Sequence, residues 1–214
     1  MATERVKNSM QHWNGSQLCA IDVETTGLTP GYHEMIQIAI LPLDNNVLPR
    51  SDVMPFYITL KPEFPGRIDK KAMSINKLNL VELLQTGFDQ IAAVDLLDQW
   101  MDKLGLAFTK YGNRKKIIPL GHNYCFDSQF IQKWLSVEQY NQWFDYHYTD
   151  TMVAARYLND RAAMHGDPVP YGHVSLTRMC NYLNVQRDRS HDALQDCRAT
   201  AEVYRRLLQT GLLA

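Results

Sequence analysis

The sequence has little that would mark a secreted, zinc-bound or membrane protein. Its four cysteines are scattered and show no CxxC spacing: Cys19, Cys125, Cys180 and Cys197. This pattern argues against a zinc site and favours reduced thiols, as in a cytoplasmic protein. No apolar run approaches the length that spans a bilayer, and the polar first 15 residues lack the apolar segment of a secretory signal. We therefore expect a cytoplasmic protein with a flexible polar leader over 1–15 and no membrane partner.

An excess of charge of one sign is also missing. The chain has 22 Lys and Arg against 23 Asp and Glu, for a formal net charge of −1. Proteins that coat long nucleic acids carry a strongly basic surface, so this balance argues against that class. The charge balance does not exclude a protein that binds a short or locally held anionic substrate. The dense basic cluster "KYGNRKK" (110–116) is read either as a solvated loop or as an arm for a substrate strand.

The order of apolar segments predicts the fold class. The 214 residues, 45% of them hydrophobic and without repeats, fit a single domain over 16–214. Strand-like segments at 17–23, 35–43 and 53–60 have short connections, which predicts an antiparallel meander. Further helices and strands are expected at 75–87, 88–105, 117–121, 126–135, 146–150, 151–158, 175–183 and 192–209. Strands followed by alternating helices and strands predict an α/β domain with a mixed sheet.

The segment "LCAIDVETTGL" (18–28) places two acids at the end of a buried strand. Residues two apart on a strand point to the same side, so Asp22 and Glu24 project together. Their mutual repulsion requires a cation or a shared proton, and hard divalent cations take carboxylate ligands. The pair alone is also explained by a strand end whose acids face solvent.

Two further acids and a histidine lie far along the chain. Asp127, in "GHNYCFD" (121–127), follows a strand within an apolar stretch, where helix capping is an alternative role. Asp196, in "HDALQD" (191–196), lies near the start of the last helix on its inward side. His191 precedes that helix and titrates near neutral pH, although a surface loop histidine is the commoner case. His122 is expected to brace a strand end by hydrogen bonding.

The three motifs together resemble those of the DEDDh 3′–5′ exonucleases, the DnaQ-like and RNase T-like family. "DVETTGL", "GHNYCFD" and "HDALQD" occur in the family order, and the third has the histidine five residues before the acid. The resemblance implies an RNase H-like fold with a mixed five-stranded β-sheet flanked by α-helices. It also implies two divalent ions, Mg²⁺ or Mn²⁺, held by Asp22, Glu24, Asp127 and Asp196, with His191 as general base. Asp150, in "YTDTMVAARYL", would be structural.

The same resemblance suggests which residues hold the substrate. Thr25 and Thr26 would meet the terminal nucleotide, and Leu28 would pack against its base. Asn123 is expected either to orient the site or to brace its turn. The segment "AMSINKL" (72–78) departs from the family's His-Gly-Ile pattern. Contacts by Asn76 and Leu78 are therefore in doubt, and Lys77 is a candidate phosphate contact.

The expected activity is metal-dependent removal of nucleoside monophosphates from a 3′ end. Single-stranded DNA is the favoured substrate and 3′ RNA trimming the alternative, because no motif reports a reader of the 2′-hydroxyl. A catalytically silent nucleic-acid-binding or accessory module of the same fold is a further alternative. A polymerase partner or a homodimer also stays open, since the near-neutral chain carries no broad basic surface of its own.

Overall fold

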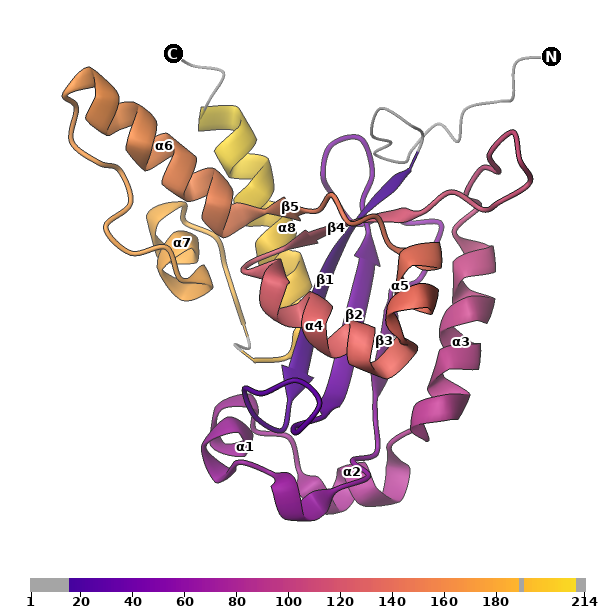
Figure 1. Cartoon of the computed structure of the whole chain (residues 1–214). Coiled ribbons are helices and arrows are strands. Elements are labelled where there is room, and N and C mark those ends of the chain that lie inside the picture. The colour runs from indigo at the N-terminus through magenta and orange to yellow at the C-terminus, as the bar shows by residue number, and fades with distance from the viewer. Residues whose placement is uncertain (1–15, 189–190, 211–214) are drawn as a thin grey trace.

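The centre of the structure is a twisted sheet of five strands. The computed structural model describes residues 16–188 and 191–210. Its strands are β1 (Gln17–Thr25), β2 (Met35–Pro42), β3 (Phe56–Thr59), β4 (Ile117–Gly121) and β5 (Thr149–Asp150), in the spatial order β3-β2-β1-β4-β5. The pairs β1–β2 and β2–β3 are antiparallel, whereas β1–β4 and β4–β5 are parallel (Figure 1). The predicted meander and the mixed five-stranded sheet are confirmed.

Helices surround this sheet and join its strands. They are α1 (Lys70–Asn76), α2 (Leu80–Thr86), α3 (Gln90–Lys103), α4 (Tyr124–Leu135), α5 (Val137–Trp143), α6 (Thr151–His165), α7 (Leu176–Tyr182) and α8 (Ala193–Thr210), with a 3-10 turn at Pro65–Arg67. The short helices α1 and α2 lie beyond the end of β1 (Figure 1). Within the described ranges, no helix is long and apolar enough to cross a membrane.

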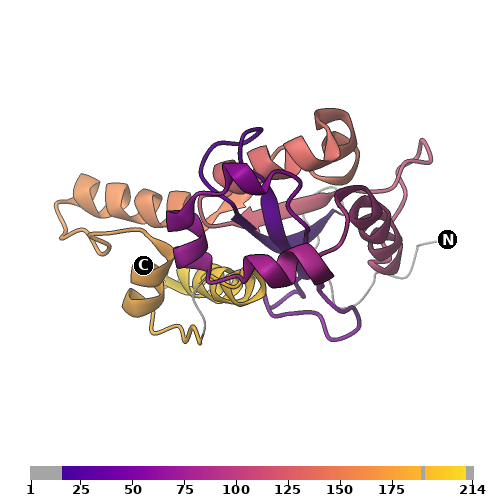
Figure 2. The same cartoon turned by 90° about the horizontal axis from the view of Figure 1, so that it is seen from below.

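The alternation of side chains along β1 divides the core into two layers. Cys19, Ile21 and Val23 point into a cluster with residues of α3, α4 and α5. Leu18 and Ala20 point to the opposite face, where residues of α8 cover them. Figure 2 shows α4 and α8 on opposite sides of the sheet. Because Asp22 and Glu24 continue the even-numbered series, they leave the strand on the face that α8 covers.

Three segments differ from the sequence predictions. The single helix expected at 75–87 is two helices, because Lys77 adopts a left-handed conformation (φ 57°) that ends α1, and the Asn79 side chain caps α2. The helix α5 (Val137–Trp143) lies between the predicted elements at 126–135 and 146–150 and was not predicted. The strand expected at 146–150 is only the two residues of β5.

The leader expected over 1–15 lies outside the described residues, as do 189–190 and 211–214. The single domain expected over 16–214 therefore stays a prediction.

Candidate active site

The first two acids of the site lie where β1 leaves its regular pairing. Asp22 pairs with Ala39 and Glu24 with Gln37 on β2, and the register shifts between Glu24 and Thr25. This irregularity ends the ladder directly after Glu24. Glu24 is buried, whereas Asp22 keeps partial access to solvent. The strand thus delivers two carboxylates to one edge of the sheet, as predicted.

The third acid comes from the start of α4. Asn123 adopts a left-handed conformation (φ 69°) between β4 and the helix, and this turn places Asp127 against the neighbouring strand. The buried Asp127 accepts a hydrogen bond on Oδ1 from the backbone N–H of Val23, at 3.0 Å. The Asp127 carboxylate therefore lies beside the backbone that separates Asp22 from Glu24. Asn123 itself is exposed and serves the turn through its backbone.

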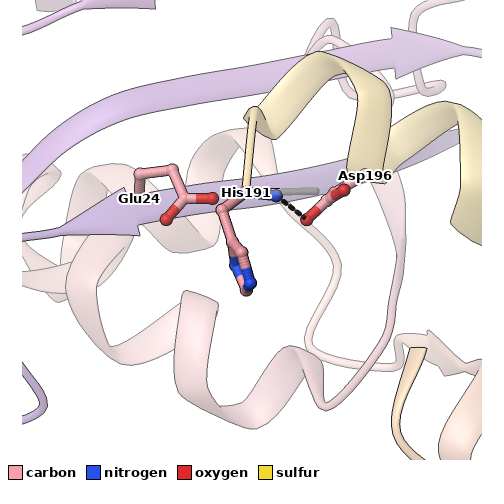
Figure 3. Close-up of side chains that lie close together, drawn as sticks. All are labelled: Glu24, His191 and Asp196. Atoms are coloured by element: carbon pink, nitrogen blue, oxygen red, sulfur yellow. Dashed lines mark hydrogen bonds between the residues drawn. The ribbon is translucent and has the colours of Figure 1, made fainter. Parts of the chain in front are cut away.

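The fourth acid and the histidine come from the start of α8. The side chain of Asp192 accepts from the N–H of Gln195 at 3.1 Å and so caps the helix. Asp196 is buried in the first turn. His191 has φ 65°, and its backbone N–H donates to Oδ2 of Asp196 at 3.2 Å, the dashed line in Figure 3. One ring nitrogen of His191 and one carboxylate oxygen each of Glu24 and Asp196 lie within 4.8 Å of one another.

A buried arginine that the sequence motifs do not include also reaches this site. Arg187 donates from Nε to Oδ1 of Asp196 at 2.7 Å and from Nη2 to Oδ2. Its Nη1 donates to the hydroxyl of Thr177 on α7 at 2.9 Å. The sequence gives no signal for this residue, because it precedes α8 in an irregular segment and finds its partner only in the folded chain.

Burial and the crowding of carboxylates raise the pKa of three acids of the site. Burial, followed by repulsion from Asp127, Asp196 and Glu24, raises the pKa of Asp22 well above its ordinary value. Burial and the neighbouring acids raise the pKa of Glu24 to about 8. Burial, opposed by the hydrogen bond from Val23, raises the pKa of Asp127 to about 8. The metal-free cluster therefore holds protons at neutral pH that a cation would replace.

The pKa of His191 is shifted in the opposite direction. Partial burial lowers its pKa, and the positive charges of Arg187 and Lys77 act in the same direction, against the attraction of Asp196. The imidazole is therefore mostly neutral at pH 7, the form in which it can accept a proton.

The donor set fits hard divalent cations. Asp22, Glu24, Asp127 and Asp196 provide oxygen ligands, the type that Mg²⁺ and Mn²⁺ prefer. Burial and the neighbouring acids raise the pKa of Asp22, Glu24 and Asp127, so a bound cation would stabilise their ionised forms. The geometric group around Glu24 also contains the His191 ring, so this nitrogen lies within reach of an ion at that position.

The predicted substrate contacts are placed around the end of β1. The Thr25 hydroxyl donates to the carbonyl of Gly27 at 2.7 Å, and the Thr26 hydroxyl accepts from the N–H of Glu34 at 2.9 Å. Both threonines are buried, whereas the Leu28 side chain is 75% exposed at the tip of this loop. The threonine hydroxyls thus shape the loop, and Leu28 presents a free apolar surface.

The segment that departs from the family pattern joins the same loop. Nδ2 of the buried Asn76 donates to the carbonyl of Thr25 at 3.2 Å, and its Oδ1 accepts from the N–H of Leu78 at 3.1 Å. Asn76 thereby ties α1 to the end of β1. Leu78 is half-buried and Lys77 is exposed.

Two predicted structural residues behave as expected. The ring nitrogen Nδ1 of His122 lies 2.8 Å from the Thr151 hydroxyl, which donates to the carbonyl of Gly121 at 3.2 Å. His122 thus joins the end of β4 to α6. Asp150 caps α6 by accepting from the N–H groups of Met152 and Val153.

Comparison with known proteins places this geometry in a family. The RNase T family model, described as "Exonuclease", matches residues 19–204. Ribonuclease T from Buchnera aphidicola subsp. Baizongia pistaciae is 25% identical over 210 residues, 95% of this chain and 89% of that protein. The 3′–5′ DNA exonuclease Cap18 from Escherichia coli is 25% identical over 189 residues, 87% of this chain and 88% of that protein.

Solved structures share the fold. The nuclease domain of 3′hExo, a DEDDh family member bound to rAMP, superposes with a TM-score of 0.64 at 20% identity, covering 91% of this chain and 92% of that one. The zinc-bound complex of E. coli ExoI with single-stranded DNA gives a TM-score of 0.69 at 18% identity, over 92% of this chain and 41% of that one. The family match covers most of the chain, and we conclude that it belongs to the RNase T family of DEDDh 3′–5′ exonucleases.

Proposed function

We propose that this protein is a metal-dependent exonuclease that hydrolyses nucleotides from the 3′ end of single-stranded DNA and releases nucleoside monophosphates. The observation that carries the proposal is the convergence of Asp22, Glu24, Asp127, Asp196 and His191 at one end of β1. These residues come from three elements that are far apart in the sequence. The raised pKa values of Asp22, Glu24 and Asp127 suit a site that receives cations and a phosphate together.

The four acids would hold two Mg²⁺ or Mn²⁺ ions. When bound, such a pair supplies the activation of the attacking water and the stabilisation of charge in an in-line displacement at phosphorus. Asp22, Glu24, Asp127 and Asp196 provide the oxygen ligands. His191 would accept the proton of the attacking water, because a neutral imidazole can act as a general base. One of its ring nitrogens lies within 4.8 Å of a carboxylate oxygen of Glu24 and of Asp196.

The loop after β1 would hold the terminal nucleotide. The exposed Leu28 side chain offers an apolar surface to the last base. The hydroxyls of Thr25 and Thr26 are engaged within the loop, and stacking on Leu28 does not depend on the sugar. These contacts require no 2′-hydroxyl, so they are compatible with DNA as substrate. Asn76 and Leu78 would support the loop, and Lys77 would approach a phosphate.

RNA trimming is the second candidate. Among the relatives, one is named as a ribonuclease and another as a DNA exonuclease, so their names support both substrates. Ribonuclease T is a relative by sequence, and so is a DNA exonuclease at the same identity. A cytoplasmic location fits the free cysteines of the chain. A polymerase or a second copy of the chain as partner stays a prediction.

The decisive experiment compares DNA and RNA strands of one sequence. Single strands labelled at the 5′ end should be shortened stepwise from the 3′ end with Mg²⁺ or Mn²⁺ and stay intact with EDTA. Asp22→Ala and His191→Ala should abolish or strongly reduce cleavage. The matched controls Asp160→Ala and His165→Ala, which change exposed residues of α6, should cleave at the wild-type rate.

Three results would contradict parts of the proposal. Faster cleavage of RNA than of DNA would overturn the DNA preference. A full rate in His191→Ala would overturn the assignment of the general base. If wild type with Mn²⁺ cleaves no 3′ end, and Asp22→Ala binds nucleic acid equally well, the protein is a catalytically silent binding module.

A further inference from the structure

Arg187 places a buried positive charge directly on one of the expected metal ligands. Only 8% of its side chain and 6% of the Asp196 side chain are exposed, and the guanidinium makes two parallel hydrogen bonds to the carboxylate. Paired bonds of this kind are strong and fix orientation. A third bond, from Nη1 to the Thr177 hydroxyl, anchors the arginine to α7. This rigid pairing is unexpected on a carboxylate that should bind a cation.

The hydrogen bonds leave little of the Asp196 carboxylate free. A carboxylate offers about four lone-pair positions. Oδ1 accepts from Arg187 Nε, and Oδ2 accepts from Arg187 Nη2 and from the backbone N–H of His191. One position remains, on Oδ1. A divalent ion at Asp196 therefore finds a single coordination position on a carboxylate whose charge is already balanced.

The charge of Arg187 extends over the rest of the site. It opposes the increase in the pKa of Asp22 and of Glu24, so it stabilises their ionised forms. A buried guanidinium is costly without a close anion, and here the acid cluster supplies that anion. Arg187 thus supplies part of the positive charge that a metal ion would supply to the acid cluster.

We propose that Arg187 is a positioning residue that acts as the internal counter-ion of the acid cluster and competes with divalent cations for Asp196. This inference rests on the proposed function, in which Asp196 is a metal ligand. The arginine holds Asp196 and the His191 backbone in place before an ion arrives. It also lowers the affinity of the empty site for a cation, because like charges repel at short range in a buried site.

The competition has a consequence for the order of binding. A nucleotide phosphate brings negative charge that offsets the combined charge of Arg187 and the cations. Cation binding at Asp196 is therefore coupled to phosphate binding, so that each strengthens the other. The site loads fully only when a 3′ end is present.

The test measures Mg²⁺ affinity in Arg187→Gln and Arg187→Lys. Calorimetric titration is done above the value of about 8 to which the pKa of Glu24 and of Asp127 is raised, so that protons compete little. Arg187→Gln should bind Mg²⁺ roughly tenfold more tightly than wild type, as expected for removal of one nearby charge from a partly screened site. Arg187→Lys, which keeps the charge but loses the paired geometry, should fall between the two.

A second readout follows the coupling to phosphate. Addition of thymidine 5′-monophosphate should strengthen Mg²⁺ binding more in wild type than in Arg187→Gln. In EDTA, Arg187→Gln should melt at a lower temperature than wild type, and Mg²⁺ should raise its melting temperature by a larger amount. Arg205→Gln is the matched control, because Arg205 pairs with Glu202 of the same helix and should leave Mg²⁺ affinity unchanged.

If Arg187 has only a structural role, its replacement should leave Mg²⁺ affinity unchanged or weaken it. If Arg187→Gln is folded by circular dichroism and binds Mg²⁺ with equal or weaker affinity than wild type, the inference is overturned. If Arg187→Gln does not fold, Arg187→Lys decides, and an affinity at or below the wild-type value overturns it. If wild type binds no Mg²⁺ even with the nucleotide, the proposed metal-dependent function fails instead.

Discussion

The starts of α4 and α6 each hold a buried aspartate, but the two carboxylates have different surroundings. Asp150 accepts three backbone hydrogen bonds, from Met152, Val153 and Tyr124, at 2.8, 3.4 and 2.7 Å. Asp127 accepts a hydrogen bond from the Val23 N–H, interacts with its own backbone N–H and lies within the field of other acids. At Asp150 the backbone donors balance the charge. At Asp127 the deficit of donors leaves a carboxylate available for a cation.

The comparison shows how a site differs from a cap of similar burial. Asp127 is 5% exposed and Asp150 8%, so burial does not distinguish them. The number of donors that face each carboxylate does.

The largest effect is expected for Asp127→Asn. Loss of a metal-ligand charge should lower the rate of 3′-end cleavage roughly a thousandfold or more, because electrostatic stabilisation by bound ions contributes several kcal/mol. The metal-free protein should be at least as stable as wild type, because one of the repelling acids is gone. Initial rates at saturating Mg²⁺ and denaturant unfolding in EDTA measure both effects. A wild-type rate would exclude Asp127 as a ligand.

Asp150→Ala should show the reverse pattern. Removing the acceptor of three buried N–H groups should lower the free energy of unfolding by about 2–4 kcal/mol. The cleavage rate per folded molecule should stay within the same order of magnitude. Denaturant unfolding measures the loss, with the exposed Asp160→Ala of α6 as control. Full stability of Asp150→Ala would mean that the cap contributes nothing.

The smallest effect concerns the pH dependence of stability without metal. For Asp22, Glu24 and Asp127 the pKa is higher in the folded state than the ordinary value. Between that ordinary value and about 8 the folded state holds more protons than the unfolded state, so the free energy of unfolding falls as pH rises. The fall should be smaller than the sum of the three separate shifts, because coupled carboxyls share protons.

The same measurement separates the two aspartates. Mg²⁺ should remove most of the decline with pH, because it replaces the protons. Asp127→Asn should flatten the decline in EDTA, and Asp150→Ala should lower stability by a similar amount at each pH. A decline equally steep in wild type and Asp127→Asn would contradict the assignment of the raised pKa to the cluster.

Much of this arrangement follows from local sequence, and the rest depends on tertiary contacts. The alternation in β1 predicts that Asp22 and Glu24 share a face, and the apolar side of α8 predicts that Asp196 lies inward. The family motifs predict which distant elements meet. The first two features follow from residue spacing, whereas the meeting of distant elements follows from the resemblance to the family.

Arg187 could not be predicted in this way, because nothing in its neighbourhood specifies a partner nine residues further along the chain. The break between α1 and α2 was also missed. Helical spacing continues across Lys77 and Asn79, and only the left-handed residue and the cap interrupt it. The internal use of the Thr25 and Thr26 hydroxyls likewise depends on the fold of the loop around them.

The long-range pairing of β1 also bears on the order in which the protein is made. β1 pairs in parallel with β4, from Gln17 with Ile117 onward, and packs against α8. Contacts of such separation form late in folding. Because domains fold as the chain emerges during synthesis, a nascent chain has β1 and α4 long before it has Arg187 and α8. The four acids therefore come together only after α8 has been synthesised, so a nascent chain that has reached α4 carries three of the acids but not the complete candidate site.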